Sequence, residues 1–427
     1  MDFTYDNPEL ERELRSAGSV ETLEAALEKI SRLVPTFLAP EIRGRQMFSP
    51  GLDAAIPELA RKLRLADVPL EKGNDNVCIV ATRFYPTGGH SKVAADIARI
   101  IGRPQVSIVL TDIYRQLNYR QLMNGQASFE PFQARSLQIL TAPTMLEKIV
   151  ELYMALAAIR PSRIFLIQNH MDLTAVAGVW PFRSVVEFVH HADHLPTLGA
   201  TLPFSGHVDL TYTCHLACKA QGLDPTWAGM TVEHAGEGVS ETPPPSPPRR
   251  IATCGSVHKY RQPGRYRWTD FAVAALQGGA AEFLHVGPVD AAFEAEVGAA
   301  LTAAGMDPAR YRFLGVAPNL RQTLIDNDVD AYMASYPESG GKAALEAMAA
   351  GIAPVVPVPE ELGPLFKFDL PIESWVRVSG PAEVATALAR SAELSAGLRS
   401  PQGREALRAE FGRFEAHIAG QAAPATT

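Results

Sequence analysis

A glycine turn between a strand and a helix is the feature that most constrains the fold of this chain. Residues 330–335 are typical of the end of a buried strand, and a run of strong helix formers extends from Lys342 to Ala350. Gly351 is placed as a helix C-cap, and the apolar residues 352–358 predict another buried strand. A strand, a helix and a strand in this order predict an α/β fold.

The turn itself, at residues 339–341, is suited to binding an anion. A glycine turn that leads into a helix presents unpaired backbone N–H groups and the positive end of the helix dipole. Glu338 lies before the turn, and Glu346 lies about two helical turns beyond it. One carboxylate is therefore expected to enter the site and the other to line its wall. The alternative is an ordinary strand–turn–helix connection, which any α/β protein contains.

Composition and charge exclude several classes of protein. The 427 residues are too many for one hydrophobic core and suit two domains. Hydrophobic residues at 47% and charged residues at 20% are typical of a soluble globular protein. No run of eighteen apolar residues occurs and the N-terminus is acidic, so we expect a cytoplasmic protein with at most peripheral contact with the inner face of a membrane. The formal net charge of −8 argues against nonspecific nucleic-acid binding.

The cysteines do not predict a special site. Four cysteines in a chain of this length give no disulfide framework. Cys214 and Cys218 lie one helical turn apart, with His215 beside Cys214. A metal site would need further ligands, and none is obvious nearby in the sequence. We therefore expect this pair to pack within a helix, and we expect no bound metal.

The first half of the chain divides into a helical extension and an α/β domain. Within residues 1–70, apolar residues recur at helical spacing from Leu23 to Val34, after Ser19 as a plausible N-cap. Over residues 71–242, short apolar strands alternate with helices, which predicts a parallel sheet with crossover helices. The expected strands are residues 77–81, 105–110, 163–167, 184–189 and 208–212, and the expected helices are residues 92–101 and 145–159.

A proline-rich segment separates this domain from a second one. Residues 243–250 cannot continue a helix or a central strand, so they predict a stiff linker. The alternation restarts over residues 251–400 as a second α/β domain, and an apolar stripe predicts a last helix at residues 401–420. The expected strands are residues 251–254, 281–286, 311–314, 330–335 and 354–358.

The loops after the strands are expected to carry the chemistry, because ligands of open α/β sheets bind beyond the carboxyl ends of the strands. Gly88 and Gly89 follow the first strand and permit close approach to the backbone, although a plain tight turn explains them equally well. Lys259, after the first strand of the second domain, can neutralise a leaving diphosphate, or it is an ordinary surface lysine.

The densest group of ionisable side chains follows the fourth strand. His190, His191 and Asp193 suit proton transfer or a contact with phosphate, because histidine titrates near neutral pH. A structural loop and a metal site are the alternatives, although adjacent histidines lack clear tetrahedral spacing. His170, after the third strand, is a weaker candidate of the same kind.

Residues 338–356 resemble the donor-binding motif of GT-B glycosyltransferases of the glycogen-synthase-like, retaining kind. That family has two glutamates separated by seven residues, followed by small residues and a Pro-Val-Val segment. Glu338 and Glu346 have this spacing, and residues 346–356 nearly copy the tail, with one additional alanine. The resemblance implies that Glu338 faces the transferred sugar and that Glu346 binds the ribose. Related epimerases and phosphorylases share parts of the motif.

The resemblance also implies an architecture and roles for the loops of the first domain. It implies an α/β fold of the GT-B type, with two Rossmann-like domains that face each other across a cleft and a last helix that crosses back to the first domain. Gly88 and Gly89 would meet the donor and the acceptor. His190 or His191 would contact the transferring sugar, and the sequence does not choose between them.

The loop at Lys259 departs from the pattern of the retaining family. Ser256 stands where that family usually has an arginine, so the loop looks closer to that of O-GlcNAc-transferase-like enzymes, which use a single lysine. The stereochemical outcome, retaining or inverting, therefore stays open. The segment that begins at Asn319 resembles the segment that lies beside the nucleotide base in GT-B enzymes.

These observations predict a glycosyltransferase that moves a sugar from a nucleoside diphosphate sugar, with UDP favoured, to a glycan, lipid-linked or protein acceptor. Lys259 and the helix start formed by Ser339, Gly340, Gly341 and Lys342 would hold the diphosphate without a divalent metal. A nucleotide-sugar epimerase and an inactive GT-B module that only binds or scaffolds are the alternatives. The acceptor, the sugar and the oligomeric state stay open.

Overall fold

The computed structural model describes residues 2–39, 41–68, 75–84, 89–115, 134–192, 194–358, 363–366 and 372–420. The chain forms two compact units. The first comprises Met1–Gly229, Leu362–Leu365 and Glu415–Ala422, and the second begins at Met230. The expected proline-rich linker lies within the second unit, because the segment before it packs there. Arg404 of that unit, for example, binds Glu241 with 2.6 Å between Nη2 and Oε1.

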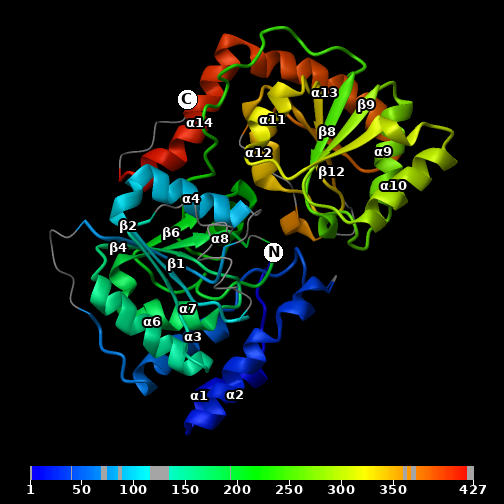
Figure 1. The fold of residues 1–427 in the computed structure, drawn as a ribbon. Helices are drawn as coiled ribbons and strands as arrows, with labels where there is room; N and C mark the ends of the chain where they lie inside the picture. The colour runs from blue at the N-terminus through cyan, green and yellow to red at the C-terminus, as the bar shows by residue number, and fades with distance from the viewer. Residues whose placement is uncertain are drawn as a thin grey trace. The chain divides into compact units, whose positions relative to one another are not determined.

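The first unit is built on a seven-stranded parallel sheet (Figure 1), as the alternation of strands and helices predicts. The strand order is β3-β2-β1-β4-β5-β6-β7. β1 therefore lies between β2 and β4 and pairs in parallel with both of them, one on each side. The strands are β1 (Val77–Ala81), β2 (Val106–Leu110), β3 (Ser136–Ile139), β4 (Arg163–Ile167), β5 (Val186–His190), β6 (Gly206–Asp209) and β7 (Thr226–Trp227).

Helices cover both faces of this sheet (Figure 1). α4 (Gly89–Ile101) lies on one face, and α6 (Met145–Ile159) and α7 (Leu173–Val179) lie on the other. α6 begins at a capping box, in which Thr144 and Glu147 each accept a hydrogen bond from the other's backbone N–H. α8 (Tyr212–Ala220) follows β6 directly and packs on β6 and β7.

The N-terminal extension is helical, as predicted, and belongs to the core of the first unit. It contains α1 (Pro8–Ser16), α2 (Val20–Ser31) and α3 (Pro50–Lys62), and Ser19 caps α2 within a capping box. Leu27 is fully buried in the same apolar cluster as the helices beneath the sheet. The carboxylate of Glu24 accepts hydrogen bonds of 2.7 and 2.9 Å from the first two backbone N–H groups of α6. The extension thus stabilises the start of a sheet-covering helix.

The second unit is a six-stranded parallel sheet with the order β10-β9-β8-β11-β12-β13. Side chains of β8, β9, β11 and β12 alternate between two apolar clusters, so both faces of the central part of the sheet are buried. Ile251 belongs to one cluster and Ala252 to the other. The strands are β8 (Arg250–Cys254), β9 (Glu282–Val286), β10 (Tyr311–Gly315), β11 (Ala331–Met333), β12 (Pro354–Pro357) and β13 (Val376–Val378).

Two sets of helices cover the faces of the second sheet (Figure 1). One face is covered by α9 (Trp268–Gln277), α10 (Ala291–Ala303) and α13 (Val384–Arg399). The other is covered by α11 (Leu320–Asp326), α12 (Gly341–Ala349) and the first part of α14 (Pro401–Ile418). The end of α14 belongs to the first unit, where Glu415 binds Arg99 at 3.2 Å. Within the described residues, no helix is both long enough and apolar enough to span a bilayer.

The differences from the expected elements lie at strand ends and sheet edges. β6 occupies residues 206–209 instead of 208–212, because Thr211 caps the next helix and ends the extended segment early. β3, β7 and β13 are absent from the predicted strands. They are two to four residues long and carry no continuous apolar run, and β3 is mostly exposed.

Replacing Leu27 with alanine should destabilise the first unit by about 2–5 kcal/mol, since it removes a fully buried side chain from the core. Val20→Ala, on the same helix and 64% exposed, is the matched control and should change stability by less than about 0.5 kcal/mol. Urea denaturation followed by circular dichroism measures both. Equal stability of Leu27→Ala and the parent would show that the extension does not contribute to the core.

Candidate functional site

The candidate site of the second unit lies at the carboxyl ends of β8 and β11. These two strands are neighbours but are not consecutive in the chain. After β8 the chain continues to β9 on one side, and after β11 it continues to β12 on the other side. Loops that leave adjacent strands in opposite directions open a crevice at the strand ends, which is where open α/β sheets bind ligands.

The two loops converge at the N-terminus of α12. Gly340 is the N-cap of this helix, and no side chain forms a hydrogen bond as its cap. The N–H groups of the first helical turn therefore lie at this edge of the sheet without a capping side chain from Gly340. Lys259 ends a short 3₁₀ segment after β8, and a methyl group built on Gly340 would lie 3.0 Å from its Nζ. A helix N-terminus and an ammonium group thus meet at one place, which favours an anion.

The two glutamates occupy different environments around this turn. Glu338 is half-buried in the turn before α12, and its backbone N–H donates to the carbonyl of Lys259 over 3.4 Å. Its own carbonyl accepts a hydrogen bond of 2.7 Å from Ser335 Oγ. Glu346 is 6% exposed and lies on α12. Glu338 is therefore the more exposed of the two residues, and their roles at the entrance and in the wall of a donor site stay predictions.

Four further predicted donor-site residues lie near or beyond this turn. Ser339 and Gly341 are half-buried beside Gly340. Lys342 is buried, and its Nζ donates to the carbonyl of Thr231, so its ammonium group is directed toward that backbone. Asn319 is the N-cap of α11 and accepts a hydrogen bond of 2.9 Å from Gln322 N–H. Its role beside a nucleotide base stays a prediction.

The corresponding edge of the first unit lies between β1 and β4. Asp172 caps α7 through a 2.9 Å hydrogen bond from Ala175 N–H. Its second carboxylate oxygen accepts hydrogen bonds from the hydroxyls of Thr82, after β1, and Thr111, after β2. Burial raises the pKa of Asp172. Asp172 therefore ties three strand ends together and is a structural group of this edge.

His191 lies just beyond the end of β5 and stacks on His90, with ring centroids 5.4 Å apart and an interplanar angle of 24°. Its Nε2 lies 2.5 Å from the carbonyl oxygen of Gln168, so Nε2 carries the proton and donates, and Nδ1 is the acceptor. Burial lowers the pKa of His191 to about 3, and it also lowers the pKa of His90. Both rings are therefore neutral near pH 7, which permits their stacking.

His90 is a site residue that the sequence did not single out. It follows Gly89 in the first turn of α4, and its Nε2 lies 3.2 Å from the carbonyl oxygen of Arg83. The structure thus brings the glycine loop and the histidine loop of the first unit together. The only signal in the sequence is the position of His90 beside a candidate glycine pair.

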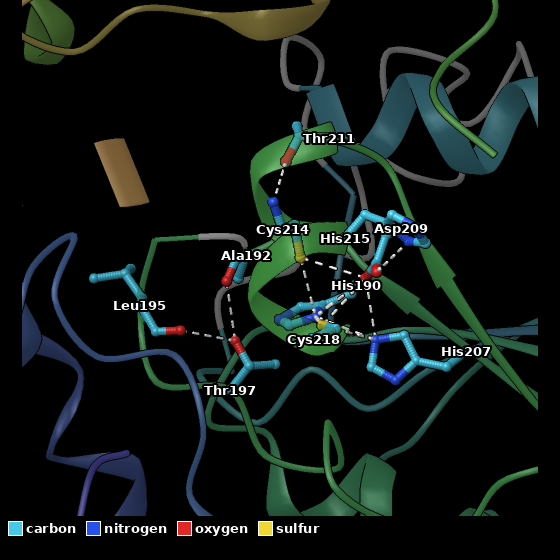
Figure 2. Close-up of polar contacts among 10 residues, drawn as sticks. All are labelled: His190, Ala192, Leu195, Thr197, His207, Asp209, Thr211, Cys214, His215 and Cys218. Atoms are coloured by element: carbon cyan, nitrogen blue, oxygen red, sulfur yellow. Dashed lines mark hydrogen bonds and ion pairs between the residues drawn. The ribbon is translucent and has the colours of Figure 1, made fainter. Parts of the chain in front are cut away.

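The other two predicted histidines, His190 and His170, are not part of the stacked pair that His90 and His191 form. His190 is the last residue of β5 and is fully buried against Asp209, Cys214 and Cys218 (Figure 2). His170 is buried beside Phe37, and burial lowers its pKa to about 3. Gly88 and Asp193 lie outside the described residues, so their predicted roles stay predictions.

Comparison with known proteins gives a likeness in structure alone. No family model matches the sequence, and no curated protein matches it. Among solved structures, Anabaena HepE in complex with UDP and glucose is similar at a TM-score of 0.55 and 12% identity, over 81% of this chain and 97% of HepE. The lipopolysaccharide outer core galactosyltransferase WaaB is similar at a TM-score of 0.52 and 13% identity, over 81% and 99%.

A third similar structure is S. aureus TarM, in complex with fondaparinux, α-GlcNAc-glycerol and UDP. Its TM-score is 0.55 at 8% identity, over 81% of this chain and 98% of TarM. The compared proteins have the GT-B fold, and the two parallel sheets of seven and six strands match it. The chain therefore has the GT-B fold, as the resemblance of residues 338–356 implies.

Proposed function

We propose that this protein is a glycosyltransferase that uses a nucleoside diphosphate sugar as donor. The observation that carries the proposal is the position of Lys259 Nζ beside Gly340, the N-cap of α12. An ammonium group, the backbone N–H groups of a first helical turn and a helix dipole at one edge of the sheet form a site for a diphosphate. UDP is the proposed nucleotide, because HepE and TarM are described in complex with UDP.

The same groups would assist the chemical step. When the bond between the sugar and the diphosphate breaks, negative charge accumulates on the leaving phosphate oxygen. Donors that are already in place stabilise this charge without reorganisation, and Lys259 supplies a full positive charge. No divalent metal is needed for this step, because the diphosphate is neutralised by Lys259 and by the N-terminus of α12.

We assign roles to the two glutamates from their exposure to solvent. Glu346, in the wall of the site, would accept hydrogen bonds from the ribose hydroxyls, and Glu338, at the entrance, would face the transferred sugar. In the first unit we assign binding of the acceptor to the edge that carries His90 and His191. A neutral His191 offers Nδ1 as a hydrogen-bond acceptor for a hydroxyl or amide N–H of that acceptor.

Replacing Lys259 with methionine should weaken UDP binding about 10- to 100-fold, because a charge-assisted contact is lost. It should also reduce turnover about 10²–10³-fold, because the charge on the leaving group is less stabilised. Lys29→Met, at an exposed position of α2, is the matched control and should change neither quantity. Isothermal titration calorimetry with UDP and a transfer assay with UDP-sugars measure the two effects. Unchanged affinity and turnover in Lys259→Met would overturn the proposed diphosphate site.

Variants of the two glutamates should differ in their effects, one on the affinity for UDP and the other on kcat. Glu346→Gln should raise the dissociation constant of UDP about 10- to 100-fold, since the ribose loses a charge-assisted hydrogen bond. Glu338→Gln should leave UDP affinity within about twofold and lower kcat instead. Glu294→Gln, on the exposed surface of α10, is the control. If both variants change only UDP affinity, the proposed division of roles is wrong.

Product analysis tests the reaction class itself. With a UDP-sugar and a panel of glycan acceptors, a transferase yields UDP and a glycosylated acceptor. A sugar that is altered in configuration without any acceptor would identify an epimerase. UDP binding with no turnover of any UDP-sugar would identify a module that only binds. Either result contradicts the proposed transfer.

A further inference from the structure

A buried group of metal-binding side chains lies in the first unit, outside the proposed nucleotide site. It consists of His190, Asp209, Cys214 and Cys218, all of them buried. One donor atom of each residue, a ring nitrogen, a carboxylate oxygen or a sulfur, lies within 4.8 Å of the others. In Figure 2 both cysteine side chains extend from one face of α8 toward the ring of His190.

The fold brings these residues together from three elements. His190 and Asp209 end the neighbouring parallel strands β5 and β6 and are partners in their register, so both lie at the same edge of the sheet. Thr211 then starts α8 by accepting a hydrogen bond of 3.3 Å from Cys214 N–H. Because Cys214 and Cys218 are four residues apart on this helix, both sulfurs lie over the strand ends.

We propose that His190 Nδ1, Asp209 Oδ1, Cys214 Sγ and Cys218 Sγ bind a zinc ion. Two thiolates, an imidazole and a carboxylate are the types of ligand that hold zinc in tetrahedral geometry, and the sulfur ligands disfavour magnesium and calcium. All four ligands come from the protein and are buried, so the site is closed. A closed site is typical of structural zinc.

The distances between the donor atoms fit a tetrahedron around zinc. Zinc–ligand bonds of about 2.0–2.3 Å at tetrahedral angles place neighbouring donors about 3.3–3.8 Å apart. His190 Nδ1 lies 3.2 Å from Cys214 Sγ, 3.5 Å from Cys218 Sγ and 3.6 Å from Asp209 Oδ1. Asp209 Oδ1 lies 3.3 Å from Cys214 Sγ and 3.5 Å from Cys218 Sγ. These five edges differ from the ideal values by a few tenths of an ångström.

Hydrogen bonding alone does not account for this arrangement. Nδ1 of His190 has either one proton or one lone pair, so it forms one hydrogen bond in its plane. Four polar atoms nevertheless surround it within 3.6 Å, since His207 Nε2 lies 3.3 Å away in addition to the two sulfurs and Asp209 Oδ1. A cation bound by His190 Nδ1, Asp209 Oδ1 and the two sulfurs satisfies these four atoms at once, which one shared proton does not, and His207 Nε2 is then left to donate to Asp209 Oδ1.

Two further histidines support the site from outside. His207 Nε2 lies 3.1 Å from Asp209 Oδ1, and His215 Nδ1 lies 3.5 Å from Asp209 Oδ2. Within the described part of the chain, neither Asp209 Oδ2 nor His215 Nδ1 has a hydrogen-bond partner, although both are buried. Metal-bound carboxylates are usually oriented by such outer donors. His207 is therefore a positioning residue for Asp209, whereas His215 only faces Asp209 Oδ2 at 3.5 Å.

The test is the metal content of the full-length protein. Protein purified without chelators should contain about one zinc per chain by inductively coupled plasma mass spectrometry. After removal of zinc with a chelator, Co²⁺ should restore occupancy and give the visible absorption of tetrahedral cobalt with thiolate charge-transfer bands. A folded protein that holds neither zinc after purification nor cobalt after its addition overturns the proposal.

Variants connect the metal to these residues. Cys214→Ser with Cys218→Ser should abolish zinc retention, whereas Cys254→Ser, in β8 of the second unit, should retain it fully. His207→Asn should weaken zinc affinity about 10- to 100-fold in competition with a chromophoric chelator. If the double cysteine variant does not fold, the cobalt spectrum of the parent protein decides, because thiolate bands require cysteine ligands. Full zinc retention in a folded double variant assigns the metal elsewhere and overturns the site.

Discussion

The pairing of β8 with β11 is the interaction on which the candidate donor site depends. Ala331 pairs with Ile251 and Tyr332 with Ala252, so the two strands end at the same edge of the sheet. The intervening chain forms β9 and β10 on the far side of β8. Lys259 and Gly340 are therefore neighbours, although they are far apart in the sequence. A glycine in place of a capping side chain leaves the helix N-terminus to an external anion.

The sequence predicts the buried parts of this fold well. Residues 77–81, 163–167 and 145–159 form the expected strands and helix at the expected bounds, because continuous apolar runs and a capped helix leave little choice of structure. The edge strands are different. β3 is mostly exposed and β7 has two residues, so neither carries a pattern that distinguishes a strand from a loop. Their pairing with a neighbouring strand, which the local sequence does not specify, makes them strands.

The histidine loop shows how one residue changes a functional interpretation. A strand ending at residue 189 leaves His190 and His191 as two equivalent loop residues. The strand in fact ends at His190, and side chains alternate along a strand, so His190 is buried under α8 and His191 leaves the sheet toward His90. Likewise, the spacing of Cys214 and Cys218 is visible in the sequence. Their partners His190 and Asp209 meet them only through the register of β5 with β6.

The proposed zinc ligand His190 and the proposed acceptor-binding residue His191 are adjacent in the chain. His190 is held by the end of β5 and by three other donors, and His191, the next residue, presents its ring to His90. Thr197 Oγ1 donates to the carbonyls of Ala192 and Leu195 and closes the following turn (Figure 2). A ligand bond at His190 fixes the backbone from which His191 projects, and a functional side chain is oriented best when its supporting residues are themselves fixed. The metal would thus act on the edge by position alone, while the positive charge for the proposed diphosphate would come from Lys259 and the N-terminus of α12 in the second unit.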